Sequence, residues 1–318
     1  MHYPELVAER DAWILAQRPP RNQLDPLRPS AFLVEQERTA SGEIVPVATI
    51  FLANRECPWH CLMCDLWRNT LSGDTPLGSI PAQIEYALNR LPAARQIKLY
   101  NSGSFFDRKA IPPEDHAAIV RLVSGFERVI VECHPALVGE DCLRFRDRLG
   151  SGLEVAMGLE TIHPQILEKL NKRMTAVQFA AAADRLRAND IDLRVFILVQ
   201  PPFMPASESL AWTARSLDFA FDCDATVATL IPTRAGNGAM ESLSAHGHFS
   251  PPTLETLEAA AEYGVGLGRG RVFADLWDIS PLPTCASCRD GRIARLRRMN
   301  LEQRIPPALA CDSCGGQG

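Results

Sequence analysis

The sequence lacks the features that would place the chain in a membrane or along a nucleic-acid backbone. No segment reaches the ~18 apolar residues that a membrane-spanning helix needs, and residues 1–5 contain no basic stretch followed by an apolar core. The formal net charge of -5 argues against a generally basic surface, although local basic patches are compatible with it. Internal repeats and low-complexity tracts are also absent. With 46% hydrophobic and 22% charged residues, the chain has the composition of a globular protein, and we expect it in the cytoplasm.

Cysteine is the residue type that stands out. Seven of the ten cysteines lie in tight motifs, which indicates metal ligation more than disulfides. Cys57, Cys61 and Cys64 follow the apolar run 48–53 with a C-x3-C-x2-C spacing. Three thiolates at this spacing can hold three irons of a [4Fe–4S] cube and leave the fourth iron open for chemistry. Buried reduced thiols or a zinc site are the alternatives, but zinc sites usually pair their ligands in two knuckles.

Short β-rich runs alternate with longer helical patterns from residue 48 onward, which is typical of βα units around a parallel sheet. Strands are predicted near residues 46–54, 96–101, 128–134, 153–160, 192–199 and 225–232. Helices are predicted near residues 81–91, 113–126, 140–149, 164–188 with a break around Met174-Thr175, 208–222 and 254–263. These units predict an α/β fold, a partial (β/α)6 barrel, with its reactive groups at the carboxyl ends of the strands.

Two end segments flank this barrel. Residues 1–45 are predicted to form an N-terminal extension with irregular packing over the barrel, and its last part, residues 32–35 and 43–47, is predicted to be a hairpin. Residues 46–269 are assigned to the barrel itself. Residues 270–318 are predicted to be a separate C-terminal module that binds a metal.

The cluster motif and its place after the first barrel strand resemble those of the radical S-adenosylmethionine (SAM) superfamily. In that superfamily the open iron binds SAM, and the reduced cluster cleaves it to methionine and a 5′-deoxyadenosyl radical that takes hydrogen from a substrate. The resemblance implies that the loop Ser102-Gly103-Ser104 receives the amino group of SAM, with one glycine where the superfamily has a pair. It also implies that Glu160, at the end of the fourth strand, contacts SAM. Met63 stands where many members carry an aromatic residue and is a candidate contact on the adenine side.

Three further polar residues are predicted to line the same cavity. Glu132 and His134 lie near the end of the third strand and are the candidate catalytic residues. Gln200 follows the fifth strand and is a candidate SAM contact. A histidine at a strand end is as often a satisfied structural residue as a proton carrier, so both roles stay open for His134.

The C-terminal module contains two C-x2-C knuckles, formed by Cys285 and Cys288 and by Cys311 and Cys314. Four thiolates in two such pairs suit a tetrahedral structural zinc site, and a second iron–sulfur cluster is the competing interpretation. We favour zinc. Between the knuckles, residues 289–304 combine many arginines with apolar residues at intervals of three, which predicts an amphipathic helix. Its arginines are predicted either to contact RNA phosphates or to form a solvated face of a helix that docks on the barrel.

Several motifs together are similar to those of the family that contains the radical SAM subunit of archaeosine synthase, more distantly related to the radical SAM domain of the Elongator catalytic subunit. They lie at residues 54–59, 64–68, 101–107, 158–161 and 170–174. The archaeal enzyme cleaves a C–N bond in a lysine adduct of a 7-deazaguanine base in tRNA. The resemblance therefore implies a lyase that takes hydrogen from a carbon next to nitrogen on a modified tRNA base. It also implies an electron donor such as flavodoxin or ferredoxin and a partner enzyme that supplies the substrate.

Two other functions stay open from the sequence. One is radical modification of a small metabolite or peptide, with the C-terminal module as a lid or as the carrier of a second cluster. The other is a non-catalytic RNA-binding or metal-cluster scaffold that keeps a degenerate barrel. A test of SAM binding and cleavage would distinguish the scaffold from the two enzymes, because a scaffold would neither bind nor cleave SAM. Metal analysis would distinguish the two enzymes. One cluster and one zinc per chain would favour an RNA substrate, and two clusters per chain would favour a metabolite or peptide substrate.

Overall fold

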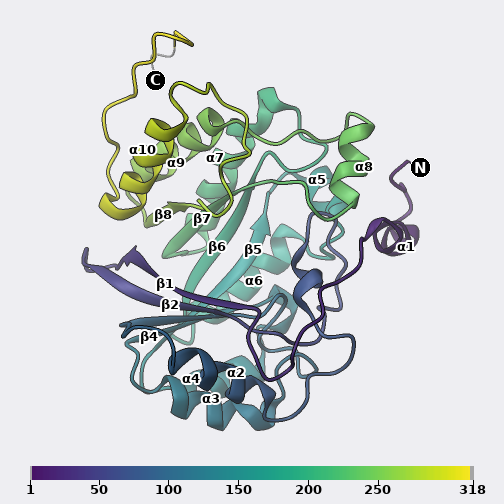
Figure 1. The fold of residues 1–318 in the computed structure, drawn as a ribbon, viewed down its shortest axis with the longest axis vertical. Helices are drawn as coiled ribbons and strands as arrows, with labels where there is room; N and C mark the ends of the chain where they lie inside the picture. The colour runs from purple at the N-terminus through teal and green to yellow at the C-terminus, as the bar shows by residue number, and fades with distance from the viewer. Residues whose placement is uncertain (1, 316–318) are drawn as a thin grey trace.

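The computed structural model describes residues 2–315, and one eight-stranded sheet runs through it (Figure 1). Its strands are β1 (Ala31–Arg38), β2 (Ile44–Phe51), β3 (Gln96–Tyr100), β4 (Arg128–Glu132), β5 (Gly152–Glu160), β6 (Asp192–Val199), β7 (Val227–Pro232) and β8 (Arg271–Ala274). The strands lie in the order of the chain, with β1 antiparallel to β2 and with β2 to β8 parallel to one another. The sheet curls into a half-barrel, so the predicted fold class is confirmed.

Helices follow most of the parallel strands and cover the outer face of the sheet (Figure 1). The α-helices of the described part are α1 (Val7–Gln17), α2 (Ser79–Leu88), α3 (His116–Val123), α4 (Glu140–Arg148), α5 (Pro164–Lys169), α6 (Ala176–Arg187), α7 (Ala206–Asp222), α8 (Ala239–Ala245), α9 (Leu254–Leu267) and α10 (Arg289–Glu302), of which α1 and α8 pack against each other. The predicted break between α5 and α6 is confirmed. It has a local cause, because Thr175 and Gln178 form a reciprocal capping box that starts α6.

The edges of the sheet come from the two end segments. The predicted hairpin is confirmed, and its strands are β1 and β2, so residues of the N-terminal extension add a strand to the barrel. At the other edge, β8 pairs with β7, and α10 packs on α9, β8 and β1. The prediction of irregular packing for residues 1–45 is wrong for α1, which is a regular helix. The division into three domains stays a prediction, and its outermost residues 1 and 316–318 lie outside the described part.

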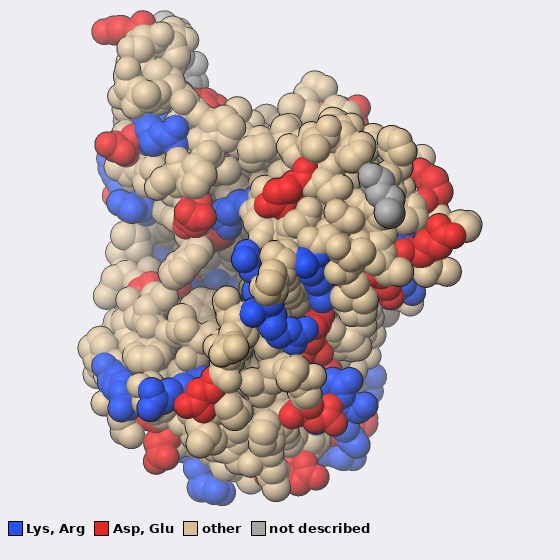
Figure 2. All heavy atoms as spheres, turned by 45° about the vertical axis from the view of Figure 1, so that its right-hand side comes forward, with Lys and Arg blue, Asp and Glu red and all other residues tan. Residues whose placement is uncertain are grey.

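The surface carries charges of both signs. On the face shown in Figure 2, Lys and Arg side chains are interspersed with Asp and Glu side chains. This pattern agrees with the small negative net charge of -5. None of the helices within residues 2–315 is long and apolar enough to cross a membrane.

Alternate residues of each strand face opposite sides of the sheet. The outward-facing residues pack against the helices and are fully buried in one continuous apolar core; they include Ile50, Leu99, Val131, Val155 and Val195. The residues between them face the concave side. There the sheet carries several charged side chains beside aromatic ones, and buried charges are unusual.

A buried charge cluster of Glu37, Lys98, Glu154 and Arg194 occupies the lower part of the concave face. Lys98 Nζ lies 2.5 Å from a Glu37 carboxylate oxygen, and Arg194 lies 2.5 Å from Glu37 and 2.6 Å from Glu154. Burial alone raises the pKa of Glu37, but Arg194 and Lys98 outweigh it and hold that pKa well below its usual range. The cluster therefore joins β1, β3, β5 and β6 by charge pairs that depend on one another.

Removal of one member leaves a buried charge without its partner. We expect Arg194→Met to lower the free energy of unfolding by about 3–5 kcal/mol, because Glu154 then loses its nearest cation and Glu37 keeps only Lys98 as a partner in a buried site. The control is Arg187→Met, which breaks exposed pairs with Asp184 and Asp224 and should cost less than about 1 kcal/mol. Urea denaturation of both variants tests this, and equal destabilisation would contradict a structural role of the cluster.

Candidate functional site

The cluster loop, residues 52–65 after β2, carries Cys57, Cys61 and Cys64 as free, partly buried thiols. Burial raises the pKa of each thiol to about 12, and the ammonium group of Lys172 lowers the pKa of Cys57 and Cys61 in part. Thiols with such a pKa stay protonated at neutral pH unless a bound metal compensates the thiolate charge. The loop therefore presents three thiols that could serve as ligands of a metal cluster.

Side-chain amides hold the cluster loop in place. Asn171 donates a hydrogen bond to the carbonyl oxygen of His60 at 2.9 Å. Asn237, which follows β7, donates to the carbonyl oxygens of Leu62 and Cys64 at 2.8 and 3.1 Å. Both asparagines are almost completely buried. The three cysteines are thus fixed by residues from two distant parts of the chain.

The serine-glycine loop, residues 101–104 after β3, lies directly against the cluster loop, as predicted. A Cβ atom placed on Gly103 would lie 3.2 Å from Cys57 Cβ, so glycine permits the close approach of the two loops. Ser102 has a positive φ of 53° and turns the backbone at this point. The Ser104 hydroxyl faces the interior, where it accepts a hydrogen bond from the His134 backbone N–H at 3.0 Å. The contacts with SAM inferred for this loop stay predictions.

Glu132 supports the same loop from the end of β4. Its carboxylate accepts a hydrogen bond from the Asn101 backbone N–H at 3.0 Å, and burial raises its pKa to about 7. The side-chain amide of Asn101 is buried, and both of its polar atoms lack a hydrogen-bond partner among the described residues. An unpaired buried amide costs free energy, so its presence fits a site that receives a polar ligand.

Glu160 and Lys172 form a buried ion pair at the carboxyl end of β5. Burial alone lowers the pKa of Lys172, but the Glu160 carboxylate outweighs it and raises that pKa, so the ammonium group stays charged. Gly158 makes room for the pair, since a Cβ atom there would overlap Glu160 Oε1 and Lys172 Nζ. Glu160 is therefore not a solvated strand-end residue, and its contact with SAM stays a prediction.

His134 connects this pair to the cluster loop. Its ring stacks on Trp59 with centroids 3.8 Å apart, and its Nε2 lies 3.1 Å from the Lys172 carbonyl oxygen. Nδ1 accepts a hydrogen bond from the Ala136 N–H at 3.2 Å. Burial, reinforced by Lys172, lowers the pKa of His134 to about 4, so the ring is neutral and both nitrogens are engaged. This geometry gives His134 a positioning role, while the catalytic roles assigned to Glu132 and His134 stay predictions.

The remaining candidate contacts hold neighbouring segments. The side-chain amide of Gln200 donates to the backbone carbonyl of Ser250 at 2.8 Å and lies 3.0 Å from its hydroxyl, so it ties the end of β6 to a loop before α9. Met63 packs partly buried between two apolar clusters, one around Trp13 and one around Leu170. Neither residue shows a contact that tests its predicted role toward SAM.

The N-terminal helix α1 covers the cluster loop; the sequence predicted that residues 1–45 pack over the barrel, but not that a regular helix does so. Arg10 is buried and lies 2.7 Å from Glu168, and Asp11 accepts a hydrogen bond from Asn171 at 2.7 Å. Trp13 packs in one apolar cluster with Leu62 of the cluster loop. The irregular sequence between α1 and β1 adds two charge pairs, because Arg18 and Arg21 each lie 2.5 Å from Glu56. The N-terminal segment therefore closes one side of the site.

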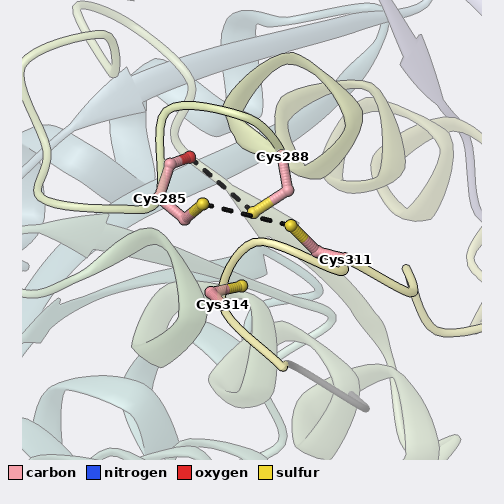
Figure 3. Close-up of side chains that lie close together, drawn as sticks. All are labelled: Cys285, Cys288, Cys311 and Cys314. Atoms are coloured by element: carbon pink, nitrogen blue, oxygen red, sulfur yellow. Dashed lines mark hydrogen bonds between the residues drawn. The ribbon is translucent and has the colours of Figure 1, made fainter.

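The four cysteines near the C-terminus come together as predicted. Their sulfur atoms all lie within 4.8 Å of one another, and Cys285 Sγ and Cys311 Sγ are 4.0 Å apart. Figure 3 shows the four side chains directed toward a common centre, from two loops far apart in the sequence. Four thiolates at about 2.3 Å from one ion must lie close together, whereas four irons of a cube hold their ligands further apart. The spacing of the four sulfur atoms therefore fits the ligands of one metal ion better than the ligands of a four-iron cube.

The predicted amphipathic helix between the knuckles is α10, and part of its arginine face is buried. Arg292 and Arg295 are almost completely buried and pair with Glu258 of α9. Arg297 and Arg304 remain exposed. The prediction of an exposed arginine face is wrong for Arg292 and Arg295, because these side chains dock α10 on α9.

The comparisons with known proteins agree with this geometry. No family model matches the chain. The chain is 26% identical to archaeosine synthase subunit beta of Methanosarcina acetivorans over 228 residues, which cover 67% of this chain and 65% of that protein. It thus spans slightly less than two thirds of the length of that relative. Among solved structures, methylornithine synthase has a TM-score of 0.51 at 14% identity and covers 78% of this chain and 66% of its own. The radical SAM methyltransferase TsrM from Kitasatospora setae has a TM-score of 0.44 at 20% identity, over 58% of this chain and 35% of its own.

The fold is therefore similar to that of methylornithine synthase, and the inferred resemblance to archaeosine synthase subunit beta is confirmed as sequence similarity. Solved structures at this level of identity establish the architecture alone. The description of the site rests on the chain's own structure, which gives the positions of the three cysteines, the serine-glycine loop and Glu160.

Gly158 gives a direct test of the site. We expect Gly158→Ala to weaken SAM binding by about tenfold or more, because the new methyl group displaces Glu160 and Lys172. Equilibrium dialysis with anaerobically reconstituted protein measures the affinity. Gly152→Ala, at the start of the same strand, is the matched control, since its Cβ would make only ordinary contacts at 3.6 Å or more with Arg128. Unchanged SAM affinity in a folded Gly158→Ala protein would contradict the placement of SAM beside this pair.

Proposed function

We propose that the protein is a radical SAM enzyme whose site lies at the carboxyl edge of the half-barrel. The observation that carries the proposal is the convergence of three elements there. The cluster loop presents three thiols, Gly103 brings the serine-glycine loop against Cys57, and the buried pair of Glu160 and Lys172 lies beside the same thiols. Each element follows the end of a parallel strand, where such folds keep their reactive groups.

Cys57, Cys61 and Cys64 would hold three irons of a [4Fe–4S] cluster, and the loop around Gly103 together with Glu160 would hold SAM. When bound, this cofactor pair supplies an electron for cleavage of SAM and a carbon radical that takes hydrogen from a substrate. The chain's own residues position and shield the pair. Lys172 places a permanent positive charge near the thiolates, which stabilises their negative charge in a buried site.

Exclusion of water is the second task of the residues around the site, because a carbon radical reacts with any accessible hydrogen donor. Helix α1 and the stacked rings of Trp59 and His134 cover the cluster loop. The buried charge cluster occupies the opposite, lower end of the barrel. The interior is thus closed at its base and partly covered at its reactive edge.

For the substrate, we propose a modified base of tRNA, with hydrogen taken from a carbon next to nitrogen and a C–N bond cleaved afterwards. Similarity to archaeosine synthase subunit beta over 67% of the chain supports this substrate class. A flavodoxin or ferredoxin would deliver the electron, and a partner enzyme would supply the lysine-modified base. Radical modification of a metabolite or peptide and a non-catalytic scaffold are the outcomes against which this proposal is tested.

The test uses tRNA from a strain of the native host that lacks this gene. We expect the reconstituted, reduced enzyme to convert one modified nucleoside of that tRNA when SAM is present, with 5′-deoxyadenosine formed in step. Mass spectrometry of digested tRNA measures the conversion. Cys57→Ala is the control and should form neither product. Cleavage of SAM without any change in tRNA would favour a metabolite or peptide substrate, and absence of both reactions would favour the scaffold.

We further propose that Cys285, Cys288, Cys311 and Cys314 bind one structural zinc ion. The compact arrangement of the sulfur atoms supports zinc over a second iron–sulfur cluster. Arg292 donates to Cys288 Sγ at 3.4 Å and provides the outer-shell hydrogen bond that such ligands usually receive.

Metal analysis tests this assignment. We expect about one zinc per chain in the purified protein, in addition to the iron of the cluster, and loss of that zinc in Cys285→Ser with a lower unfolding temperature. Cys223→Ser, which changes a cysteine outside both groups, is the control and should keep the zinc. A second equivalent of cluster iron that disappears in Cys285→Ser would contradict the zinc assignment.

A further inference from the structure

Four aromatic side chains form a row on the concave face of the sheet. They are Phe51 at the end of β2, Tyr100 at the end of β3, Phe196 in β6 and Trp277 after β8. The ring centroids of Trp277 and Phe51 are 6.3 Å apart, those of Phe51 and Tyr100 are 6.2 Å apart, and those of Tyr100 and Phe196 are 6.2 Å apart. We call these four residues the aromatic row.

The aromatic row lines open space and does not fill the core. The neighbouring outward-facing residues Ile50, Leu99 and Ile197 are 0% exposed, whereas Phe51, Tyr100 and Phe196 are partly exposed. Trp277 is 64% exposed. Rings that served only to pack the interior would be as buried as their neighbours, because protein cores are close-packed. Exposed aromatic side chains that lie together are typical of binding surfaces.

The row leads from the open side of the half-barrel to the proposed SAM site. The edge strands of the sheet, β1 and β8, are joined by a hydrogen bond at the base, where the Arg271 guanidinium donates to the Arg38 carbonyl oxygen at 3.1 Å. Trp277 and Phe51 face each other at the other end of this seam, and Figure 2 shows the molecule hollowed between its upper and lower parts. At the inner end of the row, Phe196 lies in register with Gly158, beside which Glu160 and Lys172 pair.

Polar groups flank the row on one side. Lys98 precedes Tyr100 by two residues on β3, and Arg194 precedes Phe196 by two residues on β6. Each charged side chain therefore lies on the same face of the sheet as its aromatic neighbour, one step closer to the base. Tyr100 is partly exposed, and its hydroxyl makes no hydrogen bond within the described part of the chain. A flat ligand that carries hydrogen-bonding groups on its edge would satisfy this phenol while its faces meet the other rings.

We propose that the aromatic row binds the planar heteroaromatic ring of a substrate nucleotide, which lies along the exposed side of the row and ends beside Glu160 and Lys172. Enzymes that act on a base extrude it and hold it between aromatic side chains, with hydrogen bonds to its edge. The inference rests on the proposed function for the place where hydrogen is taken. The rings and the polar groups beside them support a flat ligand with hydrogen-bonding groups on its edge.

The experiment separates base binding from turnover. Calorimetric titration of the SAM-loaded, reconstituted protein with 7-deazaguanosine measures binding, and ribose is the non-planar control ligand. We expect the nucleoside to bind and ribose not to bind, and we expect Phe196→Leu and Trp277→Leu each to raise the dissociation constant about tenfold, the size of one base–aromatic stacking contact. Trp212→Leu, which changes a tryptophan on α7 that packs against His163, is the matched control and should bind as the wild type.

The same variants are then assayed with tRNA from the gene-deletion strain. A raised KM with unchanged SAM affinity supports the proposal. Weaker nucleoside binding in the variants, with a wild type that does not convert tRNA, supports the aromatic row and removes tRNA as the substrate. Nucleoside affinity equal to wild type in folded Phe196→Leu and Trp277→Leu overturns the proposal, as does failure of the wild type to bind the nucleoside.

Discussion

The buried ion pair between Lys172 and Glu160 is the contact on which the rest of the site depends. Lys172 lies in a short segment, residues 170–173, that connects four parts of the molecule. Its backbone and side chains bind the cluster loop through Leu62 and His60, the end of β4 through His134, the end of β5 through Glu160, and α1 through Asp11. An ammonium group at this depth is stable only with a carboxylate beside it. The pair therefore fixes the segment, and the segment fixes the thiols.

The same constraint explains the polar interior of the barrel. Under the proposed function, the half-barrel would bind a charged cofactor and a polar substrate, and a concave face filled with apolar side chains would not suit either. The chain pairs its buried charges at the base, in Glu37, Lys98, Glu154 and Arg194, and leaves a row of partly exposed rings above them. The outer face keeps the continuous apolar core that holds the sheet to its helices. Stability and binding are thus assigned to opposite faces of one sheet.

The sequence predicted the features that short patterns encode. The cysteine motif, the alternation of strands and helices, the break at Thr175 and the two knuckles are all local, and the structure confirms their placement. The missed features depend on contacts between distant residues. Asn237 reaches the cluster loop across 175 residues, helix α1 begins without a side-chain cap that would mark it, and β8 has only four residues. No local pattern distinguishes such residues from ordinary polar or apolar positions.

The central claim is that the three thiols of the cluster loop and the groups around Gly103 and Glu160 together cleave SAM. The most direct measurement is 5′-deoxyadenosine formation by anaerobically reconstituted, dithionite-reduced protein, compared with a variant in which Cys57, Cys61 and Cys64 are all replaced by alanine. The account predicts formation by the intact protein and none by the variant. Absence of 5′-deoxyadenosine from intact protein that carries a verified cluster and its tRNA substrate would contradict it.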